Sequence, residues 1–389
     1  MISCARLFSR QRTFPDQLIV APLSASDIVL ERGMTKVERF PGADGIRGLA
    51  CLVVLLTHAF AMFFVTTAGL YLAGTGKIGV WLFFVLSAFL LTYKFRTSGF
   101  SASILGSYAL GRILRILPMF AVAVLVYFVL GTAGIDSARD VWLALTFQKG
   151  YAHLWTIPVE FSFYAWLPLV AALLIAARKH SIALVSVTAV ALIAVQQTLW
   201  PYWRTDINAI GTQWYASSFT IGCYLATIIN DVRGRISNRT SNFICTVVTA
   251  GLVLGSPGAR NLMFGVPYDT ALADKFVYIS AAWALFIIAT IDLKGIFGRL
   301  VNSKYMRMMG AWSYSIYLFH WLVFMHLQTR FQNSALAMLT AIGISILIGA
   351  AAYRYLEMPV ERFRHRLQAR FLANDDIQRT EGLKRTPRT

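Results

Sequence analysis

Long apolar runs dominate this chain, and their length constrains the fold more than any other feature. A bilayer core about 30 Å thick is crossed by an α-helix of about 20 apolar residues. Only 14% of the 389 residues are charged, compared with about a quarter in soluble domains. We therefore predict an all-α polytopic membrane protein with about ten transmembrane helices, at residues 46–67, 78–95, 116–134, 158–177, 181–199, 213–229, 241–256, 276–291, 309–328 and 335–353.

The distribution of basic residues predicts the orientation of these spans. Arginine and lysine concentrate in alternate loops, and the loops between them carry few. Because cytoplasmic loops of membrane proteins are rich in Lys and Arg, the alternation predicts that both termini are cytoplasmic. It also accounts for the net charge of +18 without a nucleic-acid partner. We expect a cytoplasmic N-terminal segment, a membrane domain and a basic cytoplasmic tail, at residues 1–40, 41–362 and 363–389.

Cysteine usage predicts neither a disulfide framework nor a metal site. The four cysteines are scattered, and none forms a CxxC pair: Cys4, Cys51, Cys223 and Cys245. We expect them to be small apolar packing residues and expect no bound metal. The first forty residues show no secretory signal peptide, so the first span is expected to stay in the mature protein.

Two ionisable residues stand in the first apolar run, DGIRGLACLVVLLTHAF, with the spacing Arg-x10-His. Eleven steps along an α-helix return to nearly the same face, so Arg47 and His58 share a face about 16 Å apart along the axis. With Arg47 at the membrane mouth, His58 lies near the middle of the hydrocarbon core. An ionisable group at that depth is a candidate for a functional site. The structural alternatives are an end-anchor for Arg47 and an interhelical hydrogen bond for His58.

Several stretches resemble the acyltransferase 3 family of integral membrane acyltransferases. The resemblance covers residues 40 to 362, with its blocks in the family's order, and the ordered set is far more specific than any one block. The blocks are DGIRGLACLVVLLTH, GVWLFFVLSAFLL, GRILRILP, HLWTIPVEFSFYAWLPL, WSYSIYLFH and YRYLEMPVER.

The chain departs from the family pattern at a few positions. Trp81 stands where many members carry an acidic residue, and Ala88 replaces a common glycine. Phe161 and Ser162 follow Glu160 where many members have Glu-Gln. The changes at Trp81 and Phe161 argue against an acceptor-binding role at those positions and leave the Arg47/His58 pair untouched. We also expect no fused extracytoplasmic hydrolase-like domain after the last span.

The resemblance implies acyl transfer from a thioester to a hydroxyl, which requires a base, a donor site and stabilisation of an oxyanion. His58 is the candidate base. Arg47 is a candidate both for catalysis and for binding the phosphates of acyl-CoA, because a guanidinium group binds phosphate through two parallel hydrogen bonds. Arg112 and Arg115 share a helix face three residues apart at the same mouth and are predicted to complete the phosphate site. Their alternative role is that of positive anchors at the membrane surface.

The remaining candidates have more than one interpretation. Glu160 is a candidate catalytic residue that either orients an imidazolium or binds an acceptor hydroxyl. The predicted spans place it several residues closer to the outer membrane surface than His58. His153 has the same two interpretations, and His320 is a candidate for substrate binding whose alternative is packing with a neighbouring aromatic residue. Glu357 is expected to form a local i,i+3 salt bridge with Arg354.

We therefore predict an O-acyltransferase of the cytoplasmic (inner) membrane. The resemblance implies transfer of an acyl group, most simply acetyl, from cytoplasmic acyl-CoA to a hydroxyl of a glycan or lipid-linked glycan at the cell surface or in secreted material. Expected partners are acyl-CoA as donor substrate and membrane lipids, with no permanently bound cofactor and no nucleic acid. A transporter or flippase is the alternative, although the sequence has no inverted repeat. A membrane glycan polymerase is the third possibility. We would expect such an enzyme to carry arginines in a large extracytoplasmic loop, whereas the arginines of this chain are predicted on the cytoplasmic side.

Overall fold

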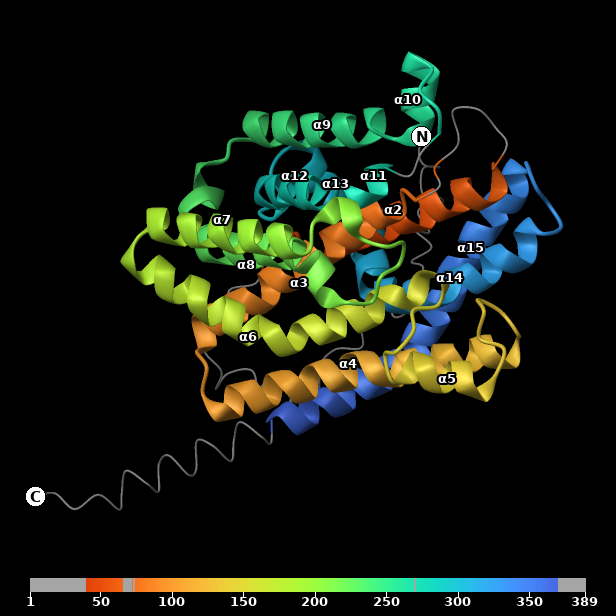
Figure 1. Ribbon diagram of the computed structural model, residues 1–389, viewed down its shortest axis with the longest axis horizontal. Helices are drawn as coiled ribbons and strands as arrows, with labels where there is room; N and C mark the ends of the chain where they lie inside the picture. Colours follow the sequence, from red (N-terminus) through yellow and green to blue (C-terminus); the bar gives the residue numbers. More distant parts are fainter. Residues whose placement is uncertain (1–39, 66–71, 73, 269–270, 370–389) are drawn as a thin grey trace, which may run out of the picture. The chain divides into compact units, whose positions relative to one another are not determined.

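The computed structural model describes residues 40–65, 72, 74–268 and 271–369, and these residues form helices and loops with no β-strand. The longer helices are α2 (Ala43–Phe63), α3 (Lys77–Ser98), α4 (Ala102–Val129), α6 (Thr156–His180), α7 (Ile182–Leu199), α8 (Thr212–Val232), α9 (Asn238–Leu254), α12 (Phe276–Thr290), α14 (Lys304–Gln328) and α15 (Ala335–Ala352) (Figure 1). The shorter ones are α5 (Ala138–Leu145), η2 (Ala152–Trp155), η3 (Tyr202–Arg204), η4 (Arg233–Arg235), α10 (Pro257–Phe264), α11 (Ala271–Asp274), α13 (Gly295–Val301) and η5 (Tyr353–Glu357).

The described helices make this a multi-pass membrane protein, but the predicted count of about ten spans is not confirmed. Six are long and apolar enough to cross a bilayer, or eight if the bent pairs α9–α10 and α12–α13 each form one span. The helices α8 and α14, where the sequence predicts two further spans, lie outside this set. Both carry many polar side chains, and α14 begins with the basic stretch KYMR. Residues 1–39 of the predicted segment 1–40 and residues 370–389 of the predicted tail 363–389 lie outside the described residues.

Glycines bring α2 and α14 into close contact, and this contact positions the site. A Cβ atom on Gly48 would lie 2.0 Å from the carbonyl oxygen of Met306, and one on Gly310 would lie 1.9 Å from that of Asp44. Only glycine permits such an approach of two backbones, as in other membrane helix pairs. The two helices therefore run side by side, with α15 next to α14 (Figure 1).

A π-helical turn at Tyr353–Glu357 interrupts the last long helix, which then continues to residue 369. The wider turn changes which side chains face the protein interior. Glu357, at its end, is 2% exposed, whereas Arg354 lies on the surface. This change of register brings the carboxylate into the helix bundle.

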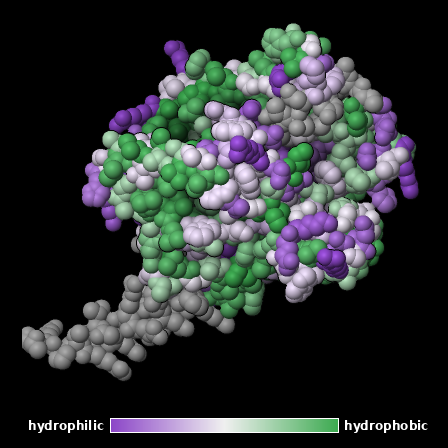
Figure 2. Space-filling model, in the orientation of Figure 1, coloured by the Kyte–Doolittle hydropathy of each residue, from purple (hydrophilic) through white to green (hydrophobic). Residues whose placement is uncertain are grey.

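Apolar side chains cover much of the outer surface, as expected where lipid is the solvent. On α6 and α7 the exposed residues include Leu169, Val187 and Val190, each more than 60% exposed. Figure 2 shows broad apolar areas on the face in view. The charged side chains of the site, by contrast, line a cavity between the helices.

Candidate functional site

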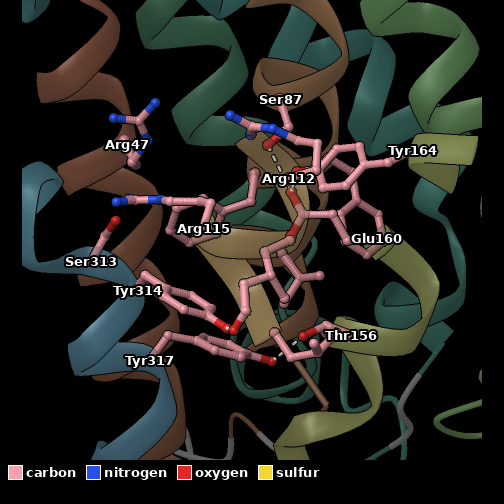
Figure 3. A pocket seen from close by; sticks show the side chains of 15 residues that line it. Arg47, Ser87, Arg112, Arg115, Thr156, Glu160, Tyr164, Ser313, Tyr314 and Tyr317 are labelled. Carbon is pink, nitrogen blue, oxygen red and sulfur yellow. Dashed lines mark hydrogen bonds between the residues drawn. The ribbon is translucent and has the colours of Figure 1, made fainter. Parts of the chain in front are cut away.

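A cavity of about 120 Å³ opens between α2, α3, α4, α6 and α14. Three arginines line it: Arg47 from α2, with Arg112 and Arg115 from α4 (Figure 3). The structure thus brings together the three arginines that the sequence predicts at one mouth. Three guanidinium groups around one cavity form a site suited to an anion with several charges.

The three arginines differ in how their charge is compensated. Arg47 forms an ion pair with Asp44, one helical turn away, at 2.8 Å. Arg115 lies 2.6 Å from Glu357. Within the described part of the chain Arg112 has no carboxylate within 4.0 Å, and its guanidinium lies over the ring of Tyr164, 5.5 Å from the ring centroid. Arg112 is therefore the guanidinium best able to bind an external anion.

The expected salt bridge between Glu357 and Arg354 is wrong. Glu357 pairs instead with Arg115 and accepts a hydrogen bond from Ser315 at 2.6 Å, while Arg354 contacts the sulfur of Met358. The π-helical turn explains the difference, because the i,i+3 spacing predicts a shared face only in a regular α-helix.

Glu160 lies among the arginines rather than beside His58. Its Oε1 atom accepts hydrogen bonds from Ser87 at 2.9 Å and from the hydroxyl of Tyr164, and its side chain lines the same cavity as Arg47 (Figure 3). The expectation that it lies further out than His58 is wrong. The helix α2 ends at Phe63, only five residues beyond His58, so His58 is at the far end of that helix. The start of α6, with His153 just before it, is at that level.

A hydrogen-bonded pair closes the end of the cavity opposite the arginines. The hydroxyl groups of Tyr317 and Thr156 lie 2.7 Å apart, and Tyr317 also donates to the carbonyl oxygen of His153 at 2.5 Å (Figure 3). Tyr317 stands one helical turn before His320 on α14. The cavity and the histidines are therefore adjacent along α14, with Tyr317 between them.

Beyond Tyr317, His58 and His320 form a direct contact between α2 and α14. Nδ1 of His58 lies 3.0 Å from Nε2 of His320, and Nδ1 of His320 lies 2.8 Å from the carbonyl oxygen of Tyr317. His320 is 1% exposed and His58 is half-buried. The ring of Trp321 packs edge-on against His58, with the centroids 5.3 Å apart. The two histidines predicted at similar depth thus meet.

His153 joins the same cluster from η2. Its ring centroid lies 4.9 Å from that of His320, and it stacks on Trp321 at 5.5 Å with an interplanar angle of 20°. Its Nε2 atom lies 3.2 Å from the carbonyl oxygen of Leu318, whereas Nδ1 has no hydrogen-bond partner although it is buried. A carbonyl only accepts, so Nε2 carries the proton, and Nδ1 of the neutral ring is a buried acceptor.

The cluster does not have the geometry of a metal centre. The described residues contain no group of three or more His, Cys, Asp or Glu side chains arranged to hold a metal ion. Cys51, Cys223 and Cys245 are free and buried, and Cys4 lies outside the described residues.

Trp81 and Phe161, two departures from the family pattern, lie outside the cavity lining. Trp81 is fully buried in an aromatic cluster with Trp155 and Tyr215, and its indole nitrogen has no hydrogen-bond partner. Phe161 packs against Phe147. Both positions therefore serve packing in this chain.

Several residues of the site are missed by reasoning from sequence alone. Ser87, Thr156 and Tyr164 hold Glu160 or close the cavity, but isolated hydroxyl groups in apolar runs give no signal of their own. A usable signal exists on α14, where Tyr314, Tyr317 and His320 follow one another at intervals of three residues and so lie along one side of the helix.

The arrangement supplies two kinds of chemistry on one helix face. Arg47 and His58 are eleven residues apart on α2, which corresponds to about 16 Å along the axis. The arginine end can bind phosphate groups. The histidine end offers an imidazole that can take up a proton.

Comparison with known proteins identifies the family of this chain. A family model described as an acyltransferase domain matches residues 40–355. Similar proteins include the O-acetyltransferase OatA of Staphylococcus aureus strains NCTC 8325 / PS 47 and MRSA252, each 24% identical over 360 residues. The alignments cover 83% of this chain and 57% of each relative, so the chain spans little more than half the length of these relatives. No solved structure matches.

The family match extends over most of the chain and includes the residues that line the cavity and the histidine cluster. Arg47, His58, Glu160 and His320 all lie within residues 40–355, and only Glu357 and the turns after it lie beyond the match. The protein therefore belongs to the acyltransferase 3 family.

Proposed function

We propose that this protein is a membrane O-acyltransferase that takes an acyl group, most simply acetyl, from cytoplasmic acyl-CoA. One observation carries the proposal: α2 presents Arg47 to a three-arginine cavity and presents His58 to a buried histidine at its other end. The similarity to O-acetyltransferases supports the choice of acetyl. The same architecture supports a place in the cytoplasmic membrane, with the arginines facing the donor.

The donor binds through its phosphates. Coenzyme A carries several phosphate groups, which match a cavity lined by Arg47, Arg112 and Arg115. To reach His58, its thioester arm displaces the hydrogen-bonded pair of Tyr317 and Thr156 that closes this end of the cavity. The separation of about 16 Å between the two ends of the face suits this extended arm. Glu160, held by Ser87 and Tyr164, lies beside the arginines and orients the donor rather than the base.

The transfer step uses His58 as general base. The acceptor hydroxyl gives its proton to the imidazole as its oxygen attacks the thioester carbonyl carbon. The C–S bond of the tetrahedral intermediate then breaks, and the leaving thiolate takes the proton back from the imidazolium. The products are an O-acyl ester and free coenzyme A, so no further reactant is needed.

The acceptor is proposed to be a hydroxyl of a glycan or lipid-linked glycan, and this class follows from the resemblance to the family. His153 is the candidate contact for that hydroxyl, because its buried Nδ1 atom is an acceptor without a partner. Membrane lipids surround the apolar exterior.

The test is transfer of label from radiolabelled acetyl-CoA in inverted membrane vesicles of the native host. Vesicles that contain the protein should move label into an alkali-labile ester of the glycan fraction, and vesicles from a deletion strain should not. Label that stays on coenzyme A in both preparations contradicts the proposal and favours a transporter.

A further inference from the structure

The hydrogen bonds around His320 fix where the protons lie on both histidines. The carbonyl oxygen of Tyr317 can only accept, so Nδ1 of His320 must donate to it. In the neutral ring Nε2 of His320 is then an acceptor. Since that atom lies 3.0 Å from Nδ1 of His58, the proton between the two rings belongs to His58. The remaining nitrogen of His58, Nε2, therefore carries the lone pair.

That lone pair faces the beginning of α3. A Cβ atom on Gly76, the residue before α3, would lie 2.3 Å from Nε2 of His58. Among the described residues, no side chain or backbone group makes a hydrogen bond to this nitrogen. Glycine at this position thus lets the backbone before α3 come close to the one nitrogen that can accept a proton, where any side chain would collide with it.

We propose that His320 is a positioning residue that fixes His58 in the tautomer with its proton on Nδ1 and so makes Nε2 the catalytic base. This inference rests on the proposed function, because it assigns the nitrogen that acts in the transfer step. His320 touches neither substrate nor reacting atoms. It acts through His58, much as a buried carboxylate orients the histidine of a serine protease, where loss of the correct tautomer lowers turnover about 10⁴-fold.

The alternative is that His320 only fills space between α2 and α14. It is 1% exposed and packs edge-on against Phe324, with the ring centroids 5.5 Å apart. A packing role predicts that any side chain of similar size serves equally well. A tautomer-fixing role requires a hydrogen-bond acceptor at the place of Nε2, facing His58.

Two amides that differ by one methylene separate these roles. The amide of His320→Gln reaches the position of Nε2, where its oxygen can accept from Nδ1 of His58. The shorter amide of His320→Asn reaches only the position of Nδ1, where it can still bond the carbonyl of Tyr317. His320→Leu keeps the apolar volume and supplies no acceptor. Each variant is assayed for kcat and for KM toward acetyl-CoA, with its thermal melting in detergent measured alongside.

We expect His320→Gln to retain kcat within about tenfold of the parent, and His320→Asn and His320→Leu to lose at least about 10²-fold, the lower limit of a general-base contribution. KM for acetyl-CoA should be unchanged in all three, because the arginines are at the other end of α2. Equal kcat values for Gln and Asn, or near-parental kcat for Leu, overturn the proposal.

Nitrogen NMR of the histidine-labelled parent protein reports the tautomer of His58 without any of the three His320 variants. The resonances of His58 are assigned from a His58→Gln sample, and the spectrum should show its proton on Nδ1. A proton on Nε2 in the parent protein overturns the assignment. Absence of acyl transfer by the parent would instead contradict the proposed function, so the two failures are distinguishable.

Discussion

Nη1 of Arg115 lies 2.6 Å from Oε1 of Glu357, whose side chain is 3% exposed. The sequence marks Arg115 as a phosphate ligand, but in the structure its charge already has a buried partner. Removing one member of a buried ion pair leaves the other charge uncompensated. Arg115 therefore supports the fold of the cavity as well as contributing to its potential.

The first prediction follows from this pair. Arg115→Ala should destabilise the protein by about 3–5 kcal/mol, the typical cost of breaking a buried pair. Thermal melting in detergent measures the effect. The double variant Arg115→Met with Glu357→Gln, which removes both charges, should recover most of the loss. A single variant as stable as the parent would show that the pair has no structural role.

Arg112 provides a cleaner test of donor binding, because it has no carboxylate partner among the described residues. Arg112→Lys keeps the charge but loses the bidentate fork. We expect KM for acetyl-CoA to rise about tenfold, which corresponds to 1.4 kcal/mol of lost binding, with no change in melting temperature. Arg354→Lys is the matched control, because Arg354 lies outside the cavity. An unchanged KM for Arg112→Lys would assign Arg112 to membrane anchoring.

Gly76→Ala tests whether the close approach of the backbone to Nε2 of His58 matters for turnover. Its backbone has φ −55°, so alanine fits the backbone, but the new Cβ would lie 2.3 Å from Nε2 of His58. We expect Gly76→Ala to lower turnover at least about 10²-fold by displacing the base. The control is Gly251→Ala, where a Cβ meets nothing within 4 Å. Near-parental turnover in Gly76→Ala would mean that Nε2 is not the reacting nitrogen.

The predictions that agree with the structure are those that follow from helical periodicity. The shared face of Arg47 and His58 and the meeting of three arginines follow from residue spacing and from the positions of loops. The level of Glu160 could not be predicted in this way, because it depends on α2 ending at Phe63 and on η2 lying beside His320. Hydropathy locates apolar runs but not the depth at which one helix passes another.

The partner of Glu357 was unpredictable for a related reason. A π-helical turn has no clear sequence signature, and it breaks the i,i+3 rule on which the expected pairing with Arg354 rests. The contact between His58 and His320 depends on glycines that bring two backbones together. Close approach of this kind depends on both helices at once, so neither segment reveals it alone.

The orientation in the membrane stays a prediction, and Gln332 tests it. The loop before α15 is tied to the end of α2, since the backbone N–H of Asn333 donates to the carbonyl oxygen of Phe63 at 2.8 Å. Alternation of basic loops predicts that this loop is extracytoplasmic. Gln332→Cys should therefore react with an impermeant maleimide in intact cells. If Gln332→Cys is labelled only after the membrane has been permeabilised, this loop is cytoplasmic and the predicted orientation is wrong.

The central claim is that His58 takes the acceptor proton while the donor is held elsewhere, and His58→Gln tests it most directly. Glutamine keeps a hydrogen-bonding side chain but cannot take up a proton. Acyl transfer from radiolabelled acetyl-CoA should fall by about 10²–10⁴-fold, while binding of acetyl-CoA, measured by calorimetry on the same purified protein, should be unchanged because the arginines lie about 16 Å away. If His58→Gln retains most of the transfer activity, His58 is a structural residue and the base lies elsewhere.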